Sequence, residues 1–188
     1  MFYCCKGNLR MGKIVLAMFV SLDGVVENPG WSMPYWSDDI SAFKAEESAE
    51  CTALLLGRVT YEGFAKAWPE SKDEGAEHMN NLVKYVPTNT LEQPEWNATF
   101  LKGDVIAQIR QLREEQNLLI YGSTVLADSL LKHNLIDEYR LLIYPVVVGE
   151  GQRLFHPGTT ATLKLVETRT MSTGVAMLKY QRIEQAAE

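Results

Sequence analysis

Three short segments at predicted strand ends carry glycine or small polar side chains, a composition suited to holding a phosphate group. They are residues 56–60 (LGRVT), 87–89 (PTN) and 121–124 (YGST). A glycine lets the backbone approach an anion, and a helix that begins there offers free N–H groups and a positive dipole end. Arg58 adds a forked cation that matches phosphate. Each segment alone is also typical of an ordinary strand-to-helix turn, but three in one small domain favour a bound nucleotide.

Other familiar ligand motifs are missing from the sequence. No Gly-x-Gly-x-x-Gly opens a helix and no P-loop occurs, so neither a standard Rossmann site nor a P-loop site is expected. Gly149, Glu150 and Gly151 follow a late strand and predict a turn that borders a ligand cleft. The three cysteines and three histidines are scattered without Cys-x-x-Cys or His-Glu-x-x-His spacing, which predicts that no metal is bound.

Two aspartates are candidates for moving a proton. Asp23 precedes Gly24 at the end of an apolar run, and Asp39 lies in the first turn of a helix predicted to begin after Ser37. A carboxyl group in a partly apolar pocket can have a raised pKa and act as a proton source or relay. The structural alternatives carry equal weight: Asp23 as a turn former, and Asp39 as a partner of the helix dipole.

Three aromatic residues, Trp31, Tyr35 and Trp36, lie in a loop rich in proline and glycine between these aspartates. Their flat rings could stack on a heterocyclic substrate. They could equally form an apolar lid over the core.

Alternating strands and helices must position these residues. Apolar runs predict strands at residues 13–20, 53–56, 84–86, 99–101, 118–121 and 139–148. Helical patterns follow residues 37, 60, 104 and 123, where Ser37, Thr60 and Asp104 are candidate N-caps. Alternation on both sides of residues 172–174 predicts a closing antiparallel hairpin. The fold class is therefore α/β with a mixed sheet.

Composition narrows the classes of function. The 188 residues carry a net charge of −6 with no basic run, which argues against a nucleic-acid partner. No stretch of about 20 apolar residues occurs, so no membrane span is expected. The start lacks a secretory signal pattern, and the few cysteines indicate a reducing compartment, so we expect a cytoplasmic protein. We interpret residues 1–12 as a flexible arm and residues 13–183 as one domain.

The order of these motifs resembles the dihydrofolate reductase superfamily. Residues 56–62 (LGRVTYE) are similar to its Gly-Arg-x-Thr segment, residues 121–126 (YGSTVL) to its glycine-rich cofactor turn, and Asp39 followed by Phe43 to its acidic residue and phenylalanine. A still closer resemblance is to the reductase domain of the bacterial riboflavin-pathway deaminase/reductase. Segments 21–24 (SLDG), 135–138 (LIDE) and 145–151 (PVVVGEG) are similar to that domain, and the resemblance covers about residues 13–183.

This resemblance implies a three-layer α/β/α reductase that binds NADPH and is a homodimer. It places the cofactor against Gly57, Arg58, Thr60, Thr88, Asn89, Gly122, Ser123, Thr124 and Val125. Thr88 and Asn89 would lie beside the adenosine ribose phosphate. The residues expected near the substrate are Trp31, Tyr35, Trp36 and Glu150, with Asp39 and then Asp23 as candidates for proton transfer.

The departures from the family keep the substrate open. The chain has no deaminase domain, the spacing around Trp31 and Pro34 differs from that of dihydrofolate reductases, and few basic residues lie near the expected pocket. The first hypothesis is an NADPH-dependent reductase of a small heterocyclic or carbonyl compound. The alternatives are a nucleotide-binding module without turnover and a partner-binding protein that has lost the cofactor.

Overall fold

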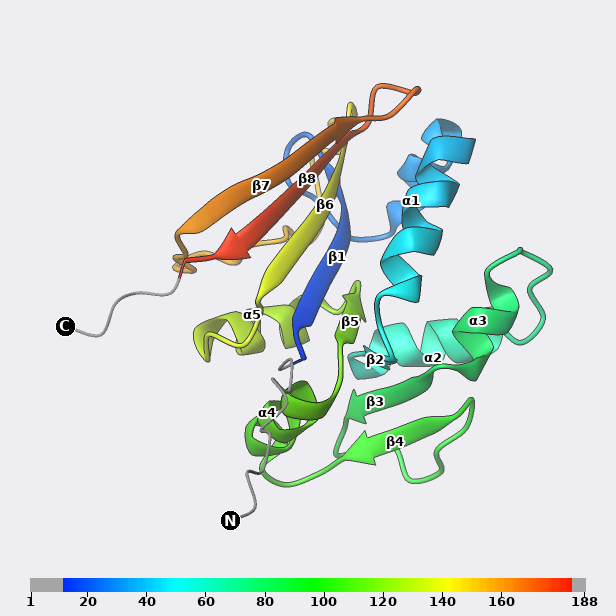
Figure 1. Cartoon of the computed structure of the whole chain (residues 1–188), viewed down its shortest axis with the longest axis vertical. Helices are drawn as coiled ribbons and strands as arrows, with labels where there is room; N and C mark the ends of the chain where they lie inside the picture. Colours follow the sequence, from blue (N-terminus) through cyan, green and yellow to red (C-terminus); the bar gives the residue numbers. More distant parts are fainter. Residues whose placement is uncertain (1–11, 184–188) are drawn as a thin grey trace, which may run out of the picture.

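Strand β1 (Ile14–Ser21) lies inside an eight-stranded sheet and is buried along almost its whole length (Figure 1). The computed structural model describes residues 12–183. The strand order is β4-β3-β2-β5-β1-β6-β8-β7. The remaining strands are β2 (Ala53–Leu55), β3 (Val83–Pro87), β4 (Ala98–Leu101), β5 (Leu118–Tyr121), β6 (Glu138–Tyr144), β7 (Leu163–Thr170) and β8 (Ala176–Arg182).

The sheet is mixed, as predicted. Strands β4, β3, β2, β5, β1 and β6 run parallel to one another, whereas β8 is antiparallel to both β6 and β7. The predicted C-terminal hairpin is therefore confirmed. Because parallel strands end at the same edge, the loops after β3, β2, β5, β1 and β6 follow one another along that edge in this order. We call it the C-terminal edge of the sheet.

Helices cover both faces of the sheet and make the predicted three layers (Figure 1). The helical segments are η1 (Pro29–Tyr35), α1 (Asp38–Ala49), α2 (Arg58–Ala67), α3 (Ala76–Asn81), α4 (Val105–Glu115) and α5 (Thr124–Lys132). Helices α4 and α5 pack on Leu16 and Ile120. Helices α1, α2 and α3 pack on the other face, where Val15, Leu54 and Leu142 belong to two further apolar clusters. None of the helices in the described range is long and apolar enough to cross a membrane.

Several predicted boundaries were wrong. Helix α2 begins at Arg58 with Gly57 as its N-cap, so Thr60 lies inside the helix. Strand β6 ends at Tyr144 instead of residue 148, because Pro145 has no N–H with which to continue the ladder. Helix α3 and the 3₁₀ helix η1, which lies in the loop rich in proline and glycine, were not predicted. The flexible arm predicted for residues 1–12 lies, apart from Gly12, outside the described residues.

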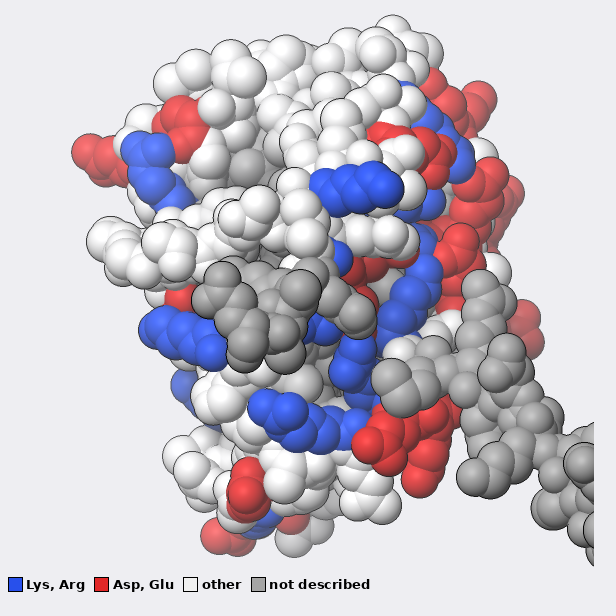
Figure 2. All heavy atoms as spheres, turned by 60° about the vertical axis from the view of Figure 1, so that its left-hand side comes forward, with Lys and Arg blue, Asp and Glu red and all other residues white. Residues whose placement is uncertain are grey.

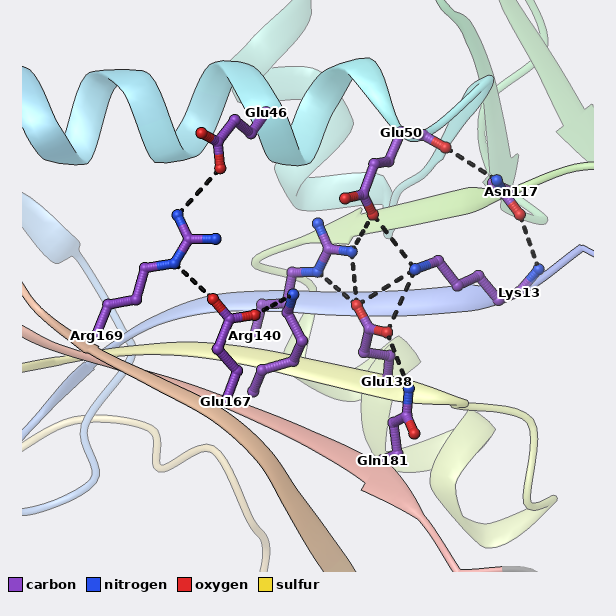
Figure 3. A network of polar contacts seen from close by, with 10 residues as sticks. Lys13, Glu46, Glu50, Asn117, Glu138, Arg140, Glu167, Arg169 and Gln181 are labelled. Atoms are coloured by element: carbon purple, nitrogen blue, oxygen red, sulfur yellow. Dashed lines mark hydrogen bonds and ion pairs between the residues drawn. The ribbon is translucent and has the colours of Figure 1, made fainter.

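A network of charges built on the buried Arg140 and Glu138 fixes the C-terminal end of α1 to the sheet (Figure 3). Arg140 is only 2% exposed, and its Nε donates to Glu138 Oε1 at 2.6 Å while its Nη2 donates to Glu50. Lys13 Nζ lies 3.3 Å from both Glu50 Oε2 and Glu138 Oε2. Burial raises the pKa of Glu138, but the charge and hydrogen bonds of Arg140 outweigh it, so the pKa is lowered. The pairing keeps these charges compatible with burial.

The same face carries a second, more exposed row of charges. Arg169 bonds to Glu46 of α1 and to Glu167 of β7, and Glu167 in turn contacts Lys179 of β8 (Figure 3). On the face of the molecule in Figure 2, basic and acidic side chains lie next to one another, and much of the upper part carries neither.

Candidate functional site

Two turns at the C-terminal edge are joined directly through one serine side chain. Ser123, after β5, accepts a hydrogen bond at its Oγ from the backbone N–H of Gly57, after β2, at 2.9 Å. The same hydroxyl lies 3.0 Å from Thr60 Oγ1 and from the Tyr121 carbonyl oxygen, either of which can accept its proton. The segments that sequence analysis assigned to the cofactor phosphates are therefore adjacent, because β2 and β5 are neighbours in the sheet.

The backbone at the second turn leaves little room for side chains. Gly122 and Ser123 both have positive φ, at 56° and 60°. A Cβ atom on Gly122 would lie 3.3 Å from Thr60 Oγ1, which is a close contact. Glycine suits this position because it has no Cβ and adopts the left-handed conformation without strain.

Helices α2 and α5 both begin at this pair of turns. Their N-caps, Gly57 and Ser123, make no side-chain cap hydrogen bond, so the first N–H groups of both helices are left for another acceptor. Two converging helix N-termini attract an anion through their N–H groups and dipoles. Arg58, in the first turn of α2, pairs with Glu62 at 2.8 Å and is 45% exposed, so it can turn toward a ligand.

The other predicted cofactor residues lie along the same edge. Thr88 follows β3, next to β2, and its Oγ1 accepts from the N–H groups of Thr90 and Leu91 at 3.2 Å, while Asn89 is exposed. Thr124 Oγ1 donates to Gln152 Oε1 at 2.9 Å, which links the turn after β5 to the loop after β6. Val125 is 70% exposed in the first turn of α5.

The structure places Asp23 in a bracing position between loops. Its carboxylate accepts from Ser21 Oγ at 2.7 Å and from the N–H groups of Val148 and Gly149 at 3.1 and 2.9 Å. The serine hydroxyl and these two backbone groups lower the pKa of Asp23 from 3.8 to about 2. Asp23 is therefore ionised at neutral pH and holds the loop after β6 against the end of β1.

Asp39 has a similar position at the start of α1, but it faces the hairpin. Its Oδ2 accepts from the backbone N–H of Ser172 at 2.6 Å, and its Oδ1 accepts from Ser172 Oγ at 3.1 Å and from the side chain of Ser37. The hydroxyl of Ser37 and the N–H of Ser172 lower the pKa of Asp39. These contacts favour the structural alternative for Asp39, because a proton source needs a raised pKa.

The three predicted aromatic residues have two different positions. Trp31 and Tyr35 of η1 pack edge-on against Tyr144, with ring centroids 5.5 and 6.0 Å away. Trp36 is 43% exposed and lies 6.1 Å from the ring of Phe19 on β1. Trp31 and Tyr35 thus cover the core, whereas Trp36 presents a ring surface beside the C-terminal edge. The predicted substrate residue Glu150 is exposed in the loop after β6.

Sequence reasoning missed a buried ion pair next to the cofactor turns. Lys44 of α1 pairs with Glu47, which is 1% exposed, and the Lys44 Nζ lies 4.2 Å from the ring centroid of Tyr121 and 5.5 Å from that of Phe19. Burial lowers the pKa of Lys44 although Glu47 partly offsets the effect. The only signal in the sequence was the lack of a clear apolar stripe on α1.

A shallow cavity of about 330 Å³ lies on the face of the sheet opposite helix α1. Its apolar lining includes Leu141, Ile143 and Phe155, and its rim includes Asp23 and Arg153. It shares the loop held by Asp23 with the site but does not reach the turns at Gly57 and Gly122.

A mixed sheet whose C-terminal edge carries two joined glycine turns and two adjacent helix N-termini is an architecture typical of α/β proteins that bind ligands beyond the carboxyl ends of their strands. The chain belongs to the RibD C-terminal domain family, whose model matches residues 12–177. It is 28% identical over 181 residues to YyaP, an uncharacterized protein of Bacillus subtilis strain 168, and the match covers 92% of this chain and 96% of YyaP.

Solved structures share the fold. A putative riboflavin biosynthesis protein from Shewanella sp. PV-4 has a TM-score of 0.75 and 20% identity, with 92% of this chain and 99% of that chain covered. Dihydrofolate reductase from Enterococcus faecalis, complexed with NADP(H), has a TM-score of 0.61 and 18% identity, with 92% and 97% covered. The predicted resemblance to both groups is thereby confirmed, and the fold is that of a reductase-type family.

Proposed function

We propose that the protein is an NADPH-dependent reductase that transfers a hydride to a small heterocyclic or carbonyl compound. The observation that carries the proposal is the pair of turns joined by Ser123 and Gly57, where two helices begin without side-chain caps. The two turns suit a cofactor phosphate, because the first N–H groups of α2 and α5 lie beside each other there, and Gly122 has no Cβ to press against Thr60 of α2.

In this proposal the chain binds and orients, and NADPH, when bound, supplies the hydride. The N-termini of α2 and α5 hold the pyrophosphate, and Arg58 with the Thr88–Asn89 turn holds the adenosine ribose phosphate. Asp23, which is ionised, orients a water molecule for the proton, and Asp39 keeps the hairpin turn at Ser172 in place. We further propose a homodimer in the cytoplasm with a small-molecule substrate and with neither a nucleic-acid nor a membrane partner.

Thermal unfolding with and without NADPH tests the proposal, with NADH in parallel. A ligand at about 100 times its Kd stabilises a protein by about 2.7 kcal/mol. For a chain of this size the Tm should rise by about 5–10 °C. A clear rise with NADPH and a smaller rise with NADH supports the site, whereas no rise with either contradicts it.

The second candidate function is a nucleotide-binding module without turnover. The low pKa of both predicted acids favours it, since neither carboxyl is poised to donate a proton. The two functions differ in one measurement: both bind NADPH, but only the reductase consumes it, as followed by the loss of absorbance at the nicotinamide band during a substrate screen.

A further inference from the structure

Lys44 of α1 holds its ammonium group over the ends of two strands at the C-terminal edge. Its Nζ lies 4.2 Å from the ring centroid of Tyr121, the last residue of β5, and 5.5 Å from that of Phe19 on β1. Ala17, the partner of Tyr121 across the β5–β1 ladder, has only a methyl group, so it leaves space beside the two rings for the lysine side chain. A cation is therefore fixed next to the Gly122 turn, on the face of the sheet that α1 covers.

The ion pair of Lys44 with Glu47 is open to water at one end only. The Lys44 side chain is 17% exposed, whereas that of Glu47 is 1% exposed and its Oε1 has no hydrogen-bond partner among the described residues. The other charged or titratable groups around the Nζ are Tyr121 on β5, Arg140 on β6 and Cys51 before β2. The positive end of the pair is thus the end that a ligand can reach, and Glu47 holds it from inside the core.

The strand order indicates which groups a bound cofactor would meet at its reacting end. In the proposed function the adenosine ribose phosphate lies at Thr88, after β3, and the pyrophosphate lies at the turns after β2 and β5. An extended dinucleotide that follows this edge continues from β5 toward β1 and β6. On the α5 side of the edge, the hydrogen bond from Thr124 to Gln152 already joins the loops after β5 and β6. The α1 side, where Lys44 lies, is therefore left for the nicotinamide end.

Lys44 also has the protonation behaviour that the two predicted aspartates lack. The low pKa of Asp23 and of Asp39 leaves both carboxyl groups ionised at neutral pH. Burial and the Glu47 carboxylate raise the pKa of Tyr121 well above its ordinary value, so the phenol keeps its proton. Burial lowers the pKa of Lys44, although Glu47 partly offsets the effect, so its ammonium group gives up a proton more readily than that of an ordinary lysine.

We propose that Lys44 is the catalytic proton donor of the reductase and acts on a substrate whose reducible bond is C=N or C=O. The inference rests on the proposed function, in which bound NADPH supplies the hydride. As the carbon of that bond accepts the hydride, its π electron pair moves to the nitrogen or oxygen, which takes a proton from the Lys44 Nζ. Lys44 becomes a neutral amine as the nicotinamide ring becomes positive, so the total charge at the site does not change. The partly exposed amine regains its proton from water, for which the molecule oriented by Asp23 is a source.

This exchange of charge predicts a binding preference that can be measured without a substrate. While Lys44 is protonated, it repels the positive ring of NADP⁺ but not the neutral ring of NADPH. Calorimetric titration of the full chain with each cofactor gives the ratio of the NADP⁺ Kd to the NADPH Kd, in which groups that respond equally to both cofactors cancel. Because loss of the Lys44 proton removes the repulsion, the wild-type ratio should fall as the pH rises from about 7 toward the ordinary lysine value of 10.5. A ratio that stays constant over this range overturns the role of Lys44 as a donor.

Three variants assign the effect to Lys44. At pH 7, Lys44→Met should lower the ratio about fivefold or more, since one unit charge close to another has an effect of this size even in water. Lys44→Arg should keep the ratio high at every pH, because a guanidinium group holds its proton. The double variant Lys44→Met/Glu47→Gln should show the same fall as Lys44→Met, and it also serves if Lys44→Met, which leaves Glu47 buried without its partner, does not fold. A fall in Lys44→Met that is absent from the double variant would be an effect of the unpaired Glu47 and would overturn the inference.

Lys84→Met is the matched control. Lys84 is also buried beside an aromatic ring, with its Nζ 3.9 Å from the ring centroid of Trp96, and burial lowers its pKa to about 8. Because Lys84 lies at the start of β3, away from the C-terminal edge, its variant should keep the wild-type ratio. An equal fall in Lys84→Met, or no fall in Lys44→Met, overturns the inference.

The rise in Tm with NADPH is measured for every variant. If NADPH fails to stabilise the wild-type chain, the proposed function itself fails. If NADPH stabilises the wild type and the variants but the ratio of the two Kd values does not depend on Lys44, only the inference about the proton donor fails.

Discussion

The Oγ of Ser123 accepts a hydrogen bond from the backbone N–H of Gly57, and this contact joins two turns that are 66 residues apart in the chain. The contact positions the N-termini of α2 and α5 side by side. A site built from backbone groups of two separate helices depends on the exact conformation of both turns. Substitutions in the turns should therefore affect binding and stability in distinguishable ways.

Gly122→Ala should destabilise the protein by about 1–2 kcal/mol, because a non-glycine residue at φ 56° enters the left-handed region and its Cβ would approach Thr60. Gly57→Ala is the control: its φ is −68° and the added Cβ would make an ordinary 3.4 Å contact with Ser123. Urea unfolding of both variants measures the difference. Equal stability losses would contradict the conformational argument.

Arg58→Ala should weaken NADPH binding about tenfold or more and NADH binding much less, because the guanidinium is assigned to the 2′-phosphate. Titration of both cofactors by calorimetry gives the two Kd values. Lys66→Ala, at the other end of α2, should change neither. An equal loss for NADPH and NADH would remove the assignment of Arg58 to the 2′-phosphate.

Asp23→Asn should lower the Tm at pH 7, and the difference from the wild type should disappear as the pH falls. The folded-state pKa of about 2 lies below the ordinary 3.8, so the contribution of the carboxylate is complete above about pH 4 and is lost as the pH falls toward 2. Thermal unfolding of both proteins between pH 2 and 7 checks this window. A difference that persists unchanged at pH 2 would speak against a bracing role for the carboxylate.

Arg140→Ala should destabilise the protein by about 3–5 kcal/mol, because it leaves the carboxylate of Glu138 buried without its main partner. Arg169→Ala should cost less than about 1 kcal/mol, since its ion pairs with Glu46 and Glu167 are largely exposed. Denaturant unfolding compares the two. If the two variants lost a similar free energy of unfolding, burial would not explain how much each ion pair stabilises the protein.

The proposed homodimer should have about twice the mass of the 21.2 kDa chain by light scattering. Leu165 and Val166 are 48% and 47% exposed on β7, the strand at one end of the sheet, and such an edge can pair with a second copy. Val166→Lys should then shift the protein toward the monomer, whereas Val147→Lys should not. A monomeric mass for the wild type would refute the proposal.

The elements with unbroken apolar patterns were predictable from sequence. Strands β1, β2 and β5 stand almost where the runs at 13–20, 53–56 and 118–121 placed them, since burial on both faces demands such runs. The turns at Gly57 and Gly122 were predictable too, because a glycine that directly follows an apolar strand indicates a turn. The sequence pattern missed η1, whose two prolines indicate a loop as readily as a 3₁₀ helix.

The contacts between distant residues could not be predicted. Asp39 meets Ser172, 133 residues away, only because the β7–β8 turn folds back to the start of α1. The burial of Lys44 and Glu47 ran against the expectation that charged helix residues face water, and it follows from their mutual pairing. The local sequence around Asp39 does not indicate Ser172 as its partner, and the spacing of Lys44 and Glu47 on one helix indicates a pair but not its burial.

The position of β5 between β2 and β1 has a consequence for synthesis on the ribosome. The first four strands to emerge include β1 and β2, but these two are not neighbours and have no common ladder until β5 arrives after residue 117. In the order of synthesis, β1 can therefore be joined to β2 only after β5 has emerged. Until then the apolar side chains of β1 lack their neighbours in the sheet, and the turns at Gly57 and Ser123 cannot meet.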